Sequence, residues 1–224
     1  MKVFSFCLYG SNPKYTMGML ENIKIINEDF PEWFTYIYYD DVPTDILEKI
    51  KSFQNIKLCK SCYTGAKTML DRFTPIDDPN VEIMLVRDAD SRIHPRDRWA
   101  INAFIKSPKK FHIIRDHIWH GTLILGGLWG IKQGLLPFKL ATSMQEFEKD
   151  KENKWQIDQI YLREYIYPRI KHDVLLHGSL KMLKEEIMVP FPCPVKDDDF
   201  CGQAIDYQNG VPVKLFDLKG FVKS

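Results

Sequence analysis

The segment 83–86, Ile-Met-Leu-Val, constrains the fold of this chain more than any other feature. Four apolar residues in succession are typical of a strand that is covered on both faces, as the strands of parallel sheets are. The segment Arg-Asp-Ala-Asp, with three charged residues, follows this run directly. The sequence therefore predicts a central strand of an α/β sheet, with ligand-binding side chains beyond its carboxyl end.

The flanking segments repeat a pattern of apolar strand and amphipathic helix, which indicates α/β architecture. We expect strands over residues 2–10, 32–40, 55–60 and 111–116, and helices over residues 15–30, 44–53, 66–73, 94–107, 135–150 and 154–170. The glycine-rich segment 123–132 is expected to be a broken strand pair or a loop, residues 148–154 an exposed connection, and the chain from Met188 onward irregular. With 224 residues, of which 45% are hydrophobic, one domain is the economical interpretation.

Composition and charge exclude several classes of protein. The 31 Lys and Arg residues balance 30 Asp and Glu residues, so the overall charge points neither to nucleic acid nor to acidic lipid. No segment approaches the roughly twenty apolar residues that span a bilayer, and the start lacks the long apolar region of a signal peptide. We therefore expect a soluble, cytoplasmic protein, in the host cytoplasm if the source is viral. The five cysteines, an odd number, are expected to be reduced thiols without a structural zinc site.

Asp88 and Asp90 directly follow the expected central strand. Residues two apart in an extended segment point the same way, so both carboxylates can face one ligand. Such oxygen ligands suit Mg²⁺ or Mn²⁺, which complete their shells with water and phosphate oxygens. A diphosphate fits this site, with the metal ion as Lewis acid and Arg87 and Arg92 as further positive charge. The alternative is a solvated turn in which the two arginines pair with the aspartates.

Several segments, in order along the chain, resemble one family of enzymes. They are residues 6–23, 31–41, 85–92, 126–132, 156–168 and 173–179. Together they resemble the GT-A glycosyltransferases that use a DxD motif, and among these the small chlorella-virus enzymes that glycosylate capsid protein. The resemblance implies α/β architecture in a single GT-A (Rossmann-like) domain over residues 1–224, with a mostly parallel central sheet flanked by helices. It also implies a nucleotide-binding half, 1–92, and an acceptor-binding half, 93–224.

The activity that this resemblance implies is that of a metal-dependent hexosyl- or pentosyltransferase. It would move a sugar from a nucleotide diphosphate donor, by family habit a UDP-sugar, to a glycan or protein-linked acceptor, with Mn²⁺ or Mg²⁺ as cofactor. Two other functions stay open. One is a sugar nucleotidylyltransferase, although residues 8–16 match a glycine-rich phosphate loop poorly. The other is an inactive carbohydrate- or nucleotide-binding protein of the same fold.

The resemblance also implies residues that bind the donor and the metal. The nucleotide base and ribose would lie against the end of the first strand and the residues after it, which are Leu8, Tyr9, Gly10 and Tyr15. Asp40 would contact the nucleoside, with a turn aspartate as the alternative. His177 matches a third metal ligand and would favour Mn²⁺, or else it is a partly buried histidine at a strand end. Lys181 would approach the diphosphate unless it is a surface lysine.

Asp158 is the candidate catalytic residue. On a helix it shares a stripe with Tyr161, Leu162 and Tyr165, so it faces inward, where burial raises the pKa of a carboxyl toward that of a general base. The resemblance implies that a carboxylate of this region, with Gln159 beside it, faces the acceptor and the reacting sugar. It would deprotonate the acceptor in an inverting enzyme or position the sugar in a retaining one. A structural role at the helix N-terminus is the alternative.

The remaining candidates come from three segments. The first contains Gly126, Gly127 and Trp129. It combines flexible backbone with an aromatic ring that suits the apolar face of a sugar. The alternative is a tight turn with a tryptophan in the core. Arg72 is a candidate for the donor's phosphates, or a solvated arginine at a helix end. His117 and His120 lie in an expected loop and are candidates for acceptor contacts.

Overall fold

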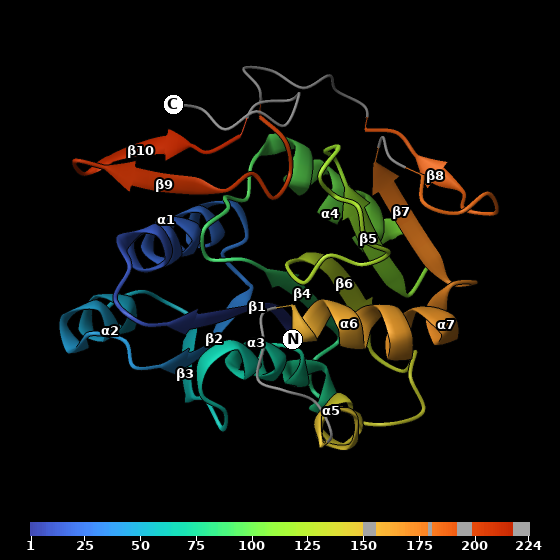
Figure 1. Cartoon of the computed structure of the whole chain (residues 1–224), viewed down its shortest axis with the longest axis horizontal. Helices are drawn as coiled ribbons and strands as arrows, with labels where there is room; N and C mark the ends of the chain where they lie inside the picture. Colours follow the sequence, from blue (N-terminus) through green and yellow to red (C-terminus); the bar gives the residue numbers. More distant parts are fainter. Residues whose placement is uncertain (150–155, 179–180, 192–198, 217–224) are drawn as a thin grey trace.

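The computed structural model describes residues 1–149, 156–178, 181–191 and 199–216. They form an α/β domain around an eight-stranded sheet with the strand order β3-β2-β1-β4-β6-β5-β7-β8 (Figure 1). The strands are β1 (Lys2–Tyr9), β2 (Phe34–Asp40), β3 (Ile56–Lys60), β4 (Ile83–Arg87), β5 (Phe111–Arg115), β6 (Leu128–Lys132), β7 (Val174–Gly178) and β8 (Met188–Val189). All neighbouring strands are parallel except that β6 runs antiparallel to both β4 and β5. The expected mostly parallel α/β sheet is confirmed.

Helices cover both faces of this sheet (Figure 1). One face carries α1 (Pro13–Asp29), α2 (Thr44–Lys51) and α4 (Pro95–Lys106). The other carries α3 (Thr68–Asp71), α5 (Leu140–Glu148), α6 (Ile157–Tyr161) and α7 (Tyr167–Ile170). Short 3-10 turns (Gly65–Lys67 and Thr74–Asp77) flank α3, and a π-helical turn (Leu162–Ile166) joins α6 to α7. Among the helices that the structure describes, none is both long enough and apolar enough to cross a bilayer.

Strand β4 has the central position that its apolar run predicts. All five of its residues are buried. Because successive side chains of a strand point to opposite faces, Met84 and Val86 join the core beneath α3, α5 and α6, whereas Ile83 and Leu85 join the core beneath α1, α2 and α4. Burial on both faces fixes the position of this strand, and with it the start of the loop that carries Asp88.

Two segments differ from the expectation. The glycine-rich segment 123–132 ends in one antiparallel strand, β6, rather than a strand pair or a loop alone. The tail, expected to be irregular, contains an antiparallel hairpin of β9 (Ile205–Gln208) and β10 (Val211–Lys214). Asn209 and Gly210 between these strands have φ angles of 52° and 78°, and positive φ at both central residues is what a two-residue hairpin turn requires. Most of the expected connection 148–154 lies outside the described residues.

Candidate active site

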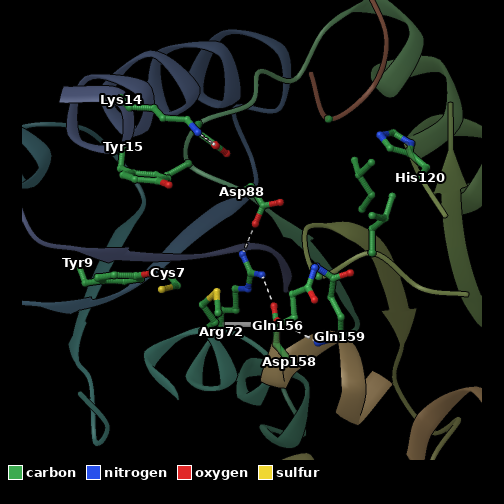
Figure 2. Close-up of a pocket in the computed structure, with 17 residues that line it drawn as sticks. Cys7, Tyr9, Lys14, Tyr15, Arg72, Asp88, His120, Gln156, Asp158 and Gln159 are labelled. Atoms are coloured by element: carbon green, nitrogen blue, oxygen red, sulfur yellow. Dashed lines mark hydrogen bonds and ion pairs between the residues drawn. The ribbon is translucent and has the colours of Figure 1, made fainter. Parts of the chain in front are cut away.

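An open cavity of about 230 Å³ lies beyond the carboxyl ends of β1 and β4 (Figure 2). This is the end of an α/β sheet at which ligands bind. The cavity brings together many of the residues that the sequence singled out: Tyr9, Tyr15, Arg72, Asp88, Asp90, His120, Gly126, Asp158 and Gln159. Its lining also includes residues that the sequence analysis did not select: Cys7, Lys14, Met69, Ala89, Leu125, Leu128, Gln156 and Gly202.

The loop that carries Asp88 and Asp90 is anchored to α1. The side-chain amide of Asn22 on α1 donates to the backbone oxygens of Ala89 (3.4 Å) and Ser91 (2.7 Å). Ala89 itself is buried, and its backbone oxygen lies so close to α1 that a Cβ atom at Gly18 would be 2.1 Å from it. The backbone between and after the two aspartates is therefore held in place, which leaves both carboxylates at the cavity surface.

Two cations face these carboxylates (Figure 2). Arg72 bridges two acids, because its Nη1 lies 2.5 Å from Asp88 Oδ1 and its Nη2 lies 2.8 Å from Asp158 Oδ2. Lys14 Nζ lies 2.8 Å from Asp90 Oδ2. The Arg72 and Asp158 side chains are almost completely buried, whereas the Asp88 side chain is 45% exposed. The cavity wall is thus an array of three acids and two cations, in which Asp88 is the acid most open to a ligand.

Lys14 lies in the first turn of α1, because this helix begins at Pro13 rather than at Tyr15 as expected. Asn12 caps the helix, since its Oδ1 accepts a hydrogen bond from the backbone nitrogen of Lys14 (2.9 Å), and Pro13 occupies the first helical position. Asn before Pro is a recognised start signal for a helix. A helix begun at this signal, rather than at Tyr15, would have put Lys14 in its first turn and brought it into consideration.

Burial shapes the ionisation of the acids in this array. It raises the pKa of Asp158, and the nearby Asp88 adds to the effect, while the hydrogen-bonded Arg72 opposes it. Burial and Asp88 likewise raise the pKa of Asp90 against the opposing influence of Lys14. Although burial disfavours a charge on Arg72, Asp88 and Asp158 raise its pKa above the ordinary value, so this guanidinium stays charged. Close carboxylates with raised pKa values are a common sign of a functional site.

Two glycines let the backbone approach the acids closely. A Cβ atom at Gly127 would lie 2.2 Å from the carboxyl group of Asp88, and one at Gly126 would lie 2.3 Å from Asp158 Oδ2. Real Cβ atoms do not approach other atoms this closely, so any side chain here would displace an acid. The sequence placed these glycines near a sugar, and the structure places both of them against the acids of the site.

Arg87 and Arg92, which were expected to add positive charge beside the aspartates, pair with neither Asp88 nor Asp90. Arg87 points away from the cavity and forms a buried bidentate pair with Asp97 on α4, at 2.9 and 2.8 Å. Arg92 donates to the hydroxyl of Tyr207 on β9 (3.0 Å). The expectation is therefore wrong for Arg87. Arg92 also donates to the backbone oxygens of Ala89 (3.2 Å) and Ser91 (2.9 Å), so it lies against the loop that carries the aspartates, but Lys14 is the cation that pairs with Asp90.

The expectation that Trp129 stacks on a sugar also needs correction. Its side chain is 1% exposed, lies in stacked contact with Phe111 at a centroid distance of 5.3 Å, and meets Phe73 edge-on at 5.0 Å. Its Nε1 donates to the backbone oxygen of Gly126 (3.2 Å). Trp129 is therefore the core tryptophan of the alternative interpretation, because strand β6 turns it toward the interior of the domain.

Of the residues proposed to contact the nucleoside, some line the cavity and others do not. Tyr9 and Tyr15 line the cavity, but Leu8 is 1% exposed and belongs to the core, so its side chain is not available to a ligand. Gly10 has a φ of 72° and donates its backbone N–H to the oxygen of Asp40 (3.1 Å). The Asp40 carboxylate lies outside the cavity lining and pairs with Lys60 Nζ at 2.7 Å.

His177 and Lys181 lie outside the cavity lining. His177 is fully buried in β7, where its Nδ1 lies 2.8 Å from Nε2 of His112 and its ring meets Trp99 edge-on at 5.2 Å. Lys181 is exposed. Within the described ranges, no group of three or more His, Cys, Asp or Glu side chains is placed to hold a metal ion. The candidate metal ligands that the cavity contains are thus the two aspartates, and the part assigned to His177 stays a prediction.

No protein-family model and no curated protein sequence matches this chain. Solved structures do. The galactosyltransferase LgtC, solved in complex with donor and acceptor sugar analogs, is 10% identical over 79% of this chain and 73% of that chain, with a TM-score of 0.52. The glycosyltransferase GlyE of Streptococcus pneumoniae TIGR4 is 15% identical over 76% of this chain and 44% of that chain, also with a TM-score of 0.52. A glycosyltransferase involved in the glycosylation of the major capsid of PBCV-1 is 16% identical over 78% of this chain and 81% of that chain, with a TM-score of 0.47.

At these identities the likeness concerns the fold. It agrees with the mostly parallel eight-stranded sheet and with helices on both of its faces. This chain has the fold of the GT-A nucleotide-sugar glycosyltransferases.

Proposed function

We propose that this chain is a metal-dependent glycosyltransferase that moves a sugar from a nucleotide diphosphate donor to a glycan or protein-linked acceptor. The donor nucleotide is UDP by the habit of the family that the sequence resembles. Support at the level of the fold comes from LgtC and GlyE, which are themselves glycosyltransferases. The choice between hexosyl and pentosyl transfer depends on contacts to the donor sugar.

The observation that carries this proposal is the charge pattern of the cavity. Asp88 and Asp90 present carboxylates beyond the end of a buried strand, and Arg72 and Lys14 lie within 2.8 Å of them. A metal–diphosphate group carries both signs of charge, because the cation seeks carboxylates and the phosphate oxygens seek ammonium and guanidinium groups. A cavity with both kinds of group side by side matches such a ligand in charge.

The acids fit Mg²⁺ or Mn²⁺ by their chemistry. Both ions accept carboxylate oxygens, and Mg²⁺ in particular binds through one or two protein carboxylates together with substrate phosphates and water. Asp88, with its side chain 45% exposed, and the adjacent Asp90 would hold the ion. Bound there, the metal supplies Lewis-acid stabilisation of the negative charge that develops on the departing diphosphate. Lys14 and Arg72 would bind the phosphate oxygens and so hold the donor in position.

Asp158 would act on the reacting sugar or on the acceptor. It lies in the first turn of α6, where its Oδ1 accepts a hydrogen bond from the backbone nitrogen of Gln159 (2.9 Å) and its Oδ2 accepts from Arg72. These contacts fix the carboxylate, while its raised pKa suits it to take up a proton. In an inverting enzyme it would deprotonate the acceptor hydroxyl, and in a retaining one it would position the donor sugar.

Calorimetric titration with UDP and with GDP, each with and without Mn²⁺, tests this proposal. The proteins are the wild type, Asp90→Asn, and the matched control Asp45→Asn, whose side chain is 68% exposed on α2 away from the cavity. We expect one nucleotide to bind in a Mn²⁺-dependent manner to the wild type and to the control. In Asp90→Asn this binding should weaken at least tenfold, because one of the two metal ligands is lost.

The outcomes separate the competing functions. Nucleotide binding that requires neither Mn²⁺ nor Asp90 would refute the metal site. Binding without release of the nucleotide from any sugar donor would favour an inactive carbohydrate- or nucleotide-binding protein. Release of pyrophosphate from a nucleoside triphosphate and a sugar phosphate would identify a nucleotidylyltransferase instead.

A further inference from the structure

A second hollow adjoins the cavity described above. It measures about 270 Å³ and shares Gln156 and Gln159 with that cavity. Because these two residues flank Asp158 along the chain, the two hollows meet beside the candidate catalytic carboxylate. Gly121, Thr122 and the neighbouring residues after β5 form the facing wall of the second hollow.

The segment after β5 carries an exposed aromatic side chain close along the chain to the wall of the second hollow. Trp119 is 67% exposed and the preceding Ile118 is 59% exposed. Trp119 precedes Gly121, which lines the second hollow, by two residues, so their Cα atoms are at most about 7 Å apart. His120, between them, lines the donor cavity. Two adjacent large apolar side chains that are exposed beside a polar cavity indicate a ligand-binding surface.

This segment is held by several contacts, so the exposure of Trp119 belongs to an ordered loop. The ring of His117 stacks on Phe200 at a centroid distance of 4.0 Å. His120 Nδ1 accepts from the backbone nitrogen of Asp116 (2.9 Å), and the backbone nitrogen of Trp119 donates to His117 Nδ1 (3.2 Å). The indole is thereby presented on a fixed support, which is the arrangement that an aromatic platform needs.

The lining of the second hollow indicates an uncharged polar ligand. Among the described residues that line it, Arg163 is the one charged side chain, and Glu164 balances it at 2.9 Å. Gln156, Gln159 and Thr122 offer amide and hydroxyl groups that both donate and accept hydrogen bonds. Sugar hydroxyls match such groups, and the C–H face of a sugar ring matches an exposed indole.

We propose that this second hollow, with Trp119 at its edge, is the acceptor subsite, and that it takes a neutral sugar at the end of a glycan. The inference rests on the proposed function. The acceptor hydroxyl oxygen forms the new bond to the donor's anomeric carbon as the bond from that carbon to the diphosphate breaks. The electron pair of the broken bond leaves with the nucleoside diphosphate, and the hydroxyl proton passes to the Asp158 carboxylate or to the departing diphosphate.

The test measures the binding of glycans and of nucleotides separately. Neutral di- and trisaccharides, and the same sugars bearing sulfate or sialic acid, are titrated against the wild type, Trp119→Ala and the control Ile187→Ala. Ile187 is 85% exposed and lines a different hollow. We expect a neutral sugar to bind the wild type and the control, and to bind Trp119→Ala about tenfold more weakly, as the loss of one aromatic contact of about 1.4 kcal/mol implies. Nucleotide binding should stay within twofold in all three proteins.

The result distinguishes this inference from the proposed function. If the wild type binds a nucleotide but none of the neutral sugars, or prefers the charged ones, the neutral acceptor subsite is wrong while the donor site stands. The same follows if Trp119→Ala binds and glycosylates the acceptor as well as the wild type does. If no nucleotide binds at all, the proposed function itself fails.

Discussion

Replacement of Lys14 by Met should shift metal binding and nucleotide binding in opposite directions. The Lys14 ammonium lies 2.8 Å from Asp90 Oδ2, and both side chains are 18% exposed. At this distance the Coulomb attraction is about 6 kcal/mol for an effective dielectric constant of about 20. Desolvation and side-chain ordering offset most of it, and pairs between the exposed and buried extremes contribute about 1–2 kcal/mol. Methionine keeps most of the length of the side chain and removes the ammonium group with its charge and its hydrogen-bond donors.

If Asp90 binds a divalent cation, that cation competes with the Lys14 ammonium for the same carboxylate. Without nucleotide, Lys14→Met should therefore bind Mn²⁺ about 5- to 30-fold more tightly than the wild type, at a pH where Asp90 is ionised. With Mn²⁺ at saturation, the same variant should bind the nucleoside diphosphate more weakly, because the ammonium that Mn²⁺ releases from Asp90 is no longer there to meet the phosphates. Lys14 would thus weaken the binding of the metal alone and strengthen the binding of the nucleotide once the metal is bound, so the site would favour metal and donor together.

Titration of free Mn²⁺ by electron paramagnetic resonance gives the first affinity, and calorimetry gives the second. Lys24→Met is the matched control, since Lys24 lies on the same helix, is 57% exposed and pairs with Glu21 in solvent. The control should leave both affinities unchanged. Weaker Mn²⁺ binding by Lys14→Met, or affinities for Mn²⁺ and nucleotide that move in the same direction, would refute the competition.

Two further predictions test the packing of the site and the pH dependence of stability. Gly127→Ala should weaken Mn²⁺-dependent nucleotide binding, measured by calorimetry, at least tenfold, because the new Cβ would lie 2.2 Å from the Asp88 carboxyl group. The control Gly121→Ala should leave this binding unchanged, because its Cβ meets nothing within 4 Å. Equal losses of affinity in the two variants would contradict this prediction. Burial acts to raise the pKa of Glu186, but hydrogen bonds from Arg115 outweigh it and lower this pKa from 4.5 to about 2. The ionised carboxylate therefore stabilises the fold fully above pH 4.5 and progressively less as the pH falls toward 2. In urea unfolding, the stability difference between wild type and Glu186→Gln should narrow by about 2 kcal/mol from pH 7 to pH 3, and a constant difference would contradict this.

The centre of the fold was predictable because its signals are local. An unbroken apolar run can only be accommodated where both faces of a strand are covered, so β4 and the acids after it were identified from about ten consecutive residues. The position of Asp158 on an inward stripe of α6 was equally local, and the structure buries it to 2% exposure. The hairpin turn at Asn209 and Gly210 carried a local signal as well, and the sequence analysis overlooked it.

The two tryptophans show what local pattern does not reveal. Trp129 lies in a glycine-rich stretch and Trp119 in a stretch with two histidines and a glycine, and either aromatic ring could stack on a sugar by composition. Which of them is exposed depends on pairing between distant segments: Trp129 is opposite Val86 and Ile113 in the sheet, and this register turns it into the core. A strand shifted by one residue would turn it toward the opposite face of the sheet, so the position of its side chain depends on the sheet register rather than on the residue type.

Contacts between distant segments also bear on the expected division of the chain at residue 92 into a nucleotide-binding half and an acceptor-binding half. The hairpin of β9 and β10 lies beside α1 (Figure 1). The backbone nitrogen of Ile205 donates to the oxygen of Asp90 (2.8 Å), and the Tyr207 hydroxyl accepts from Arg92 (3.0 Å). The loop that carries the aspartates is therefore closed by residues more than a hundred positions later. If the donor binds at this loop, changes in the hairpin will alter donor affinity, and the donor site cannot be treated as a property of residues 1–92 alone.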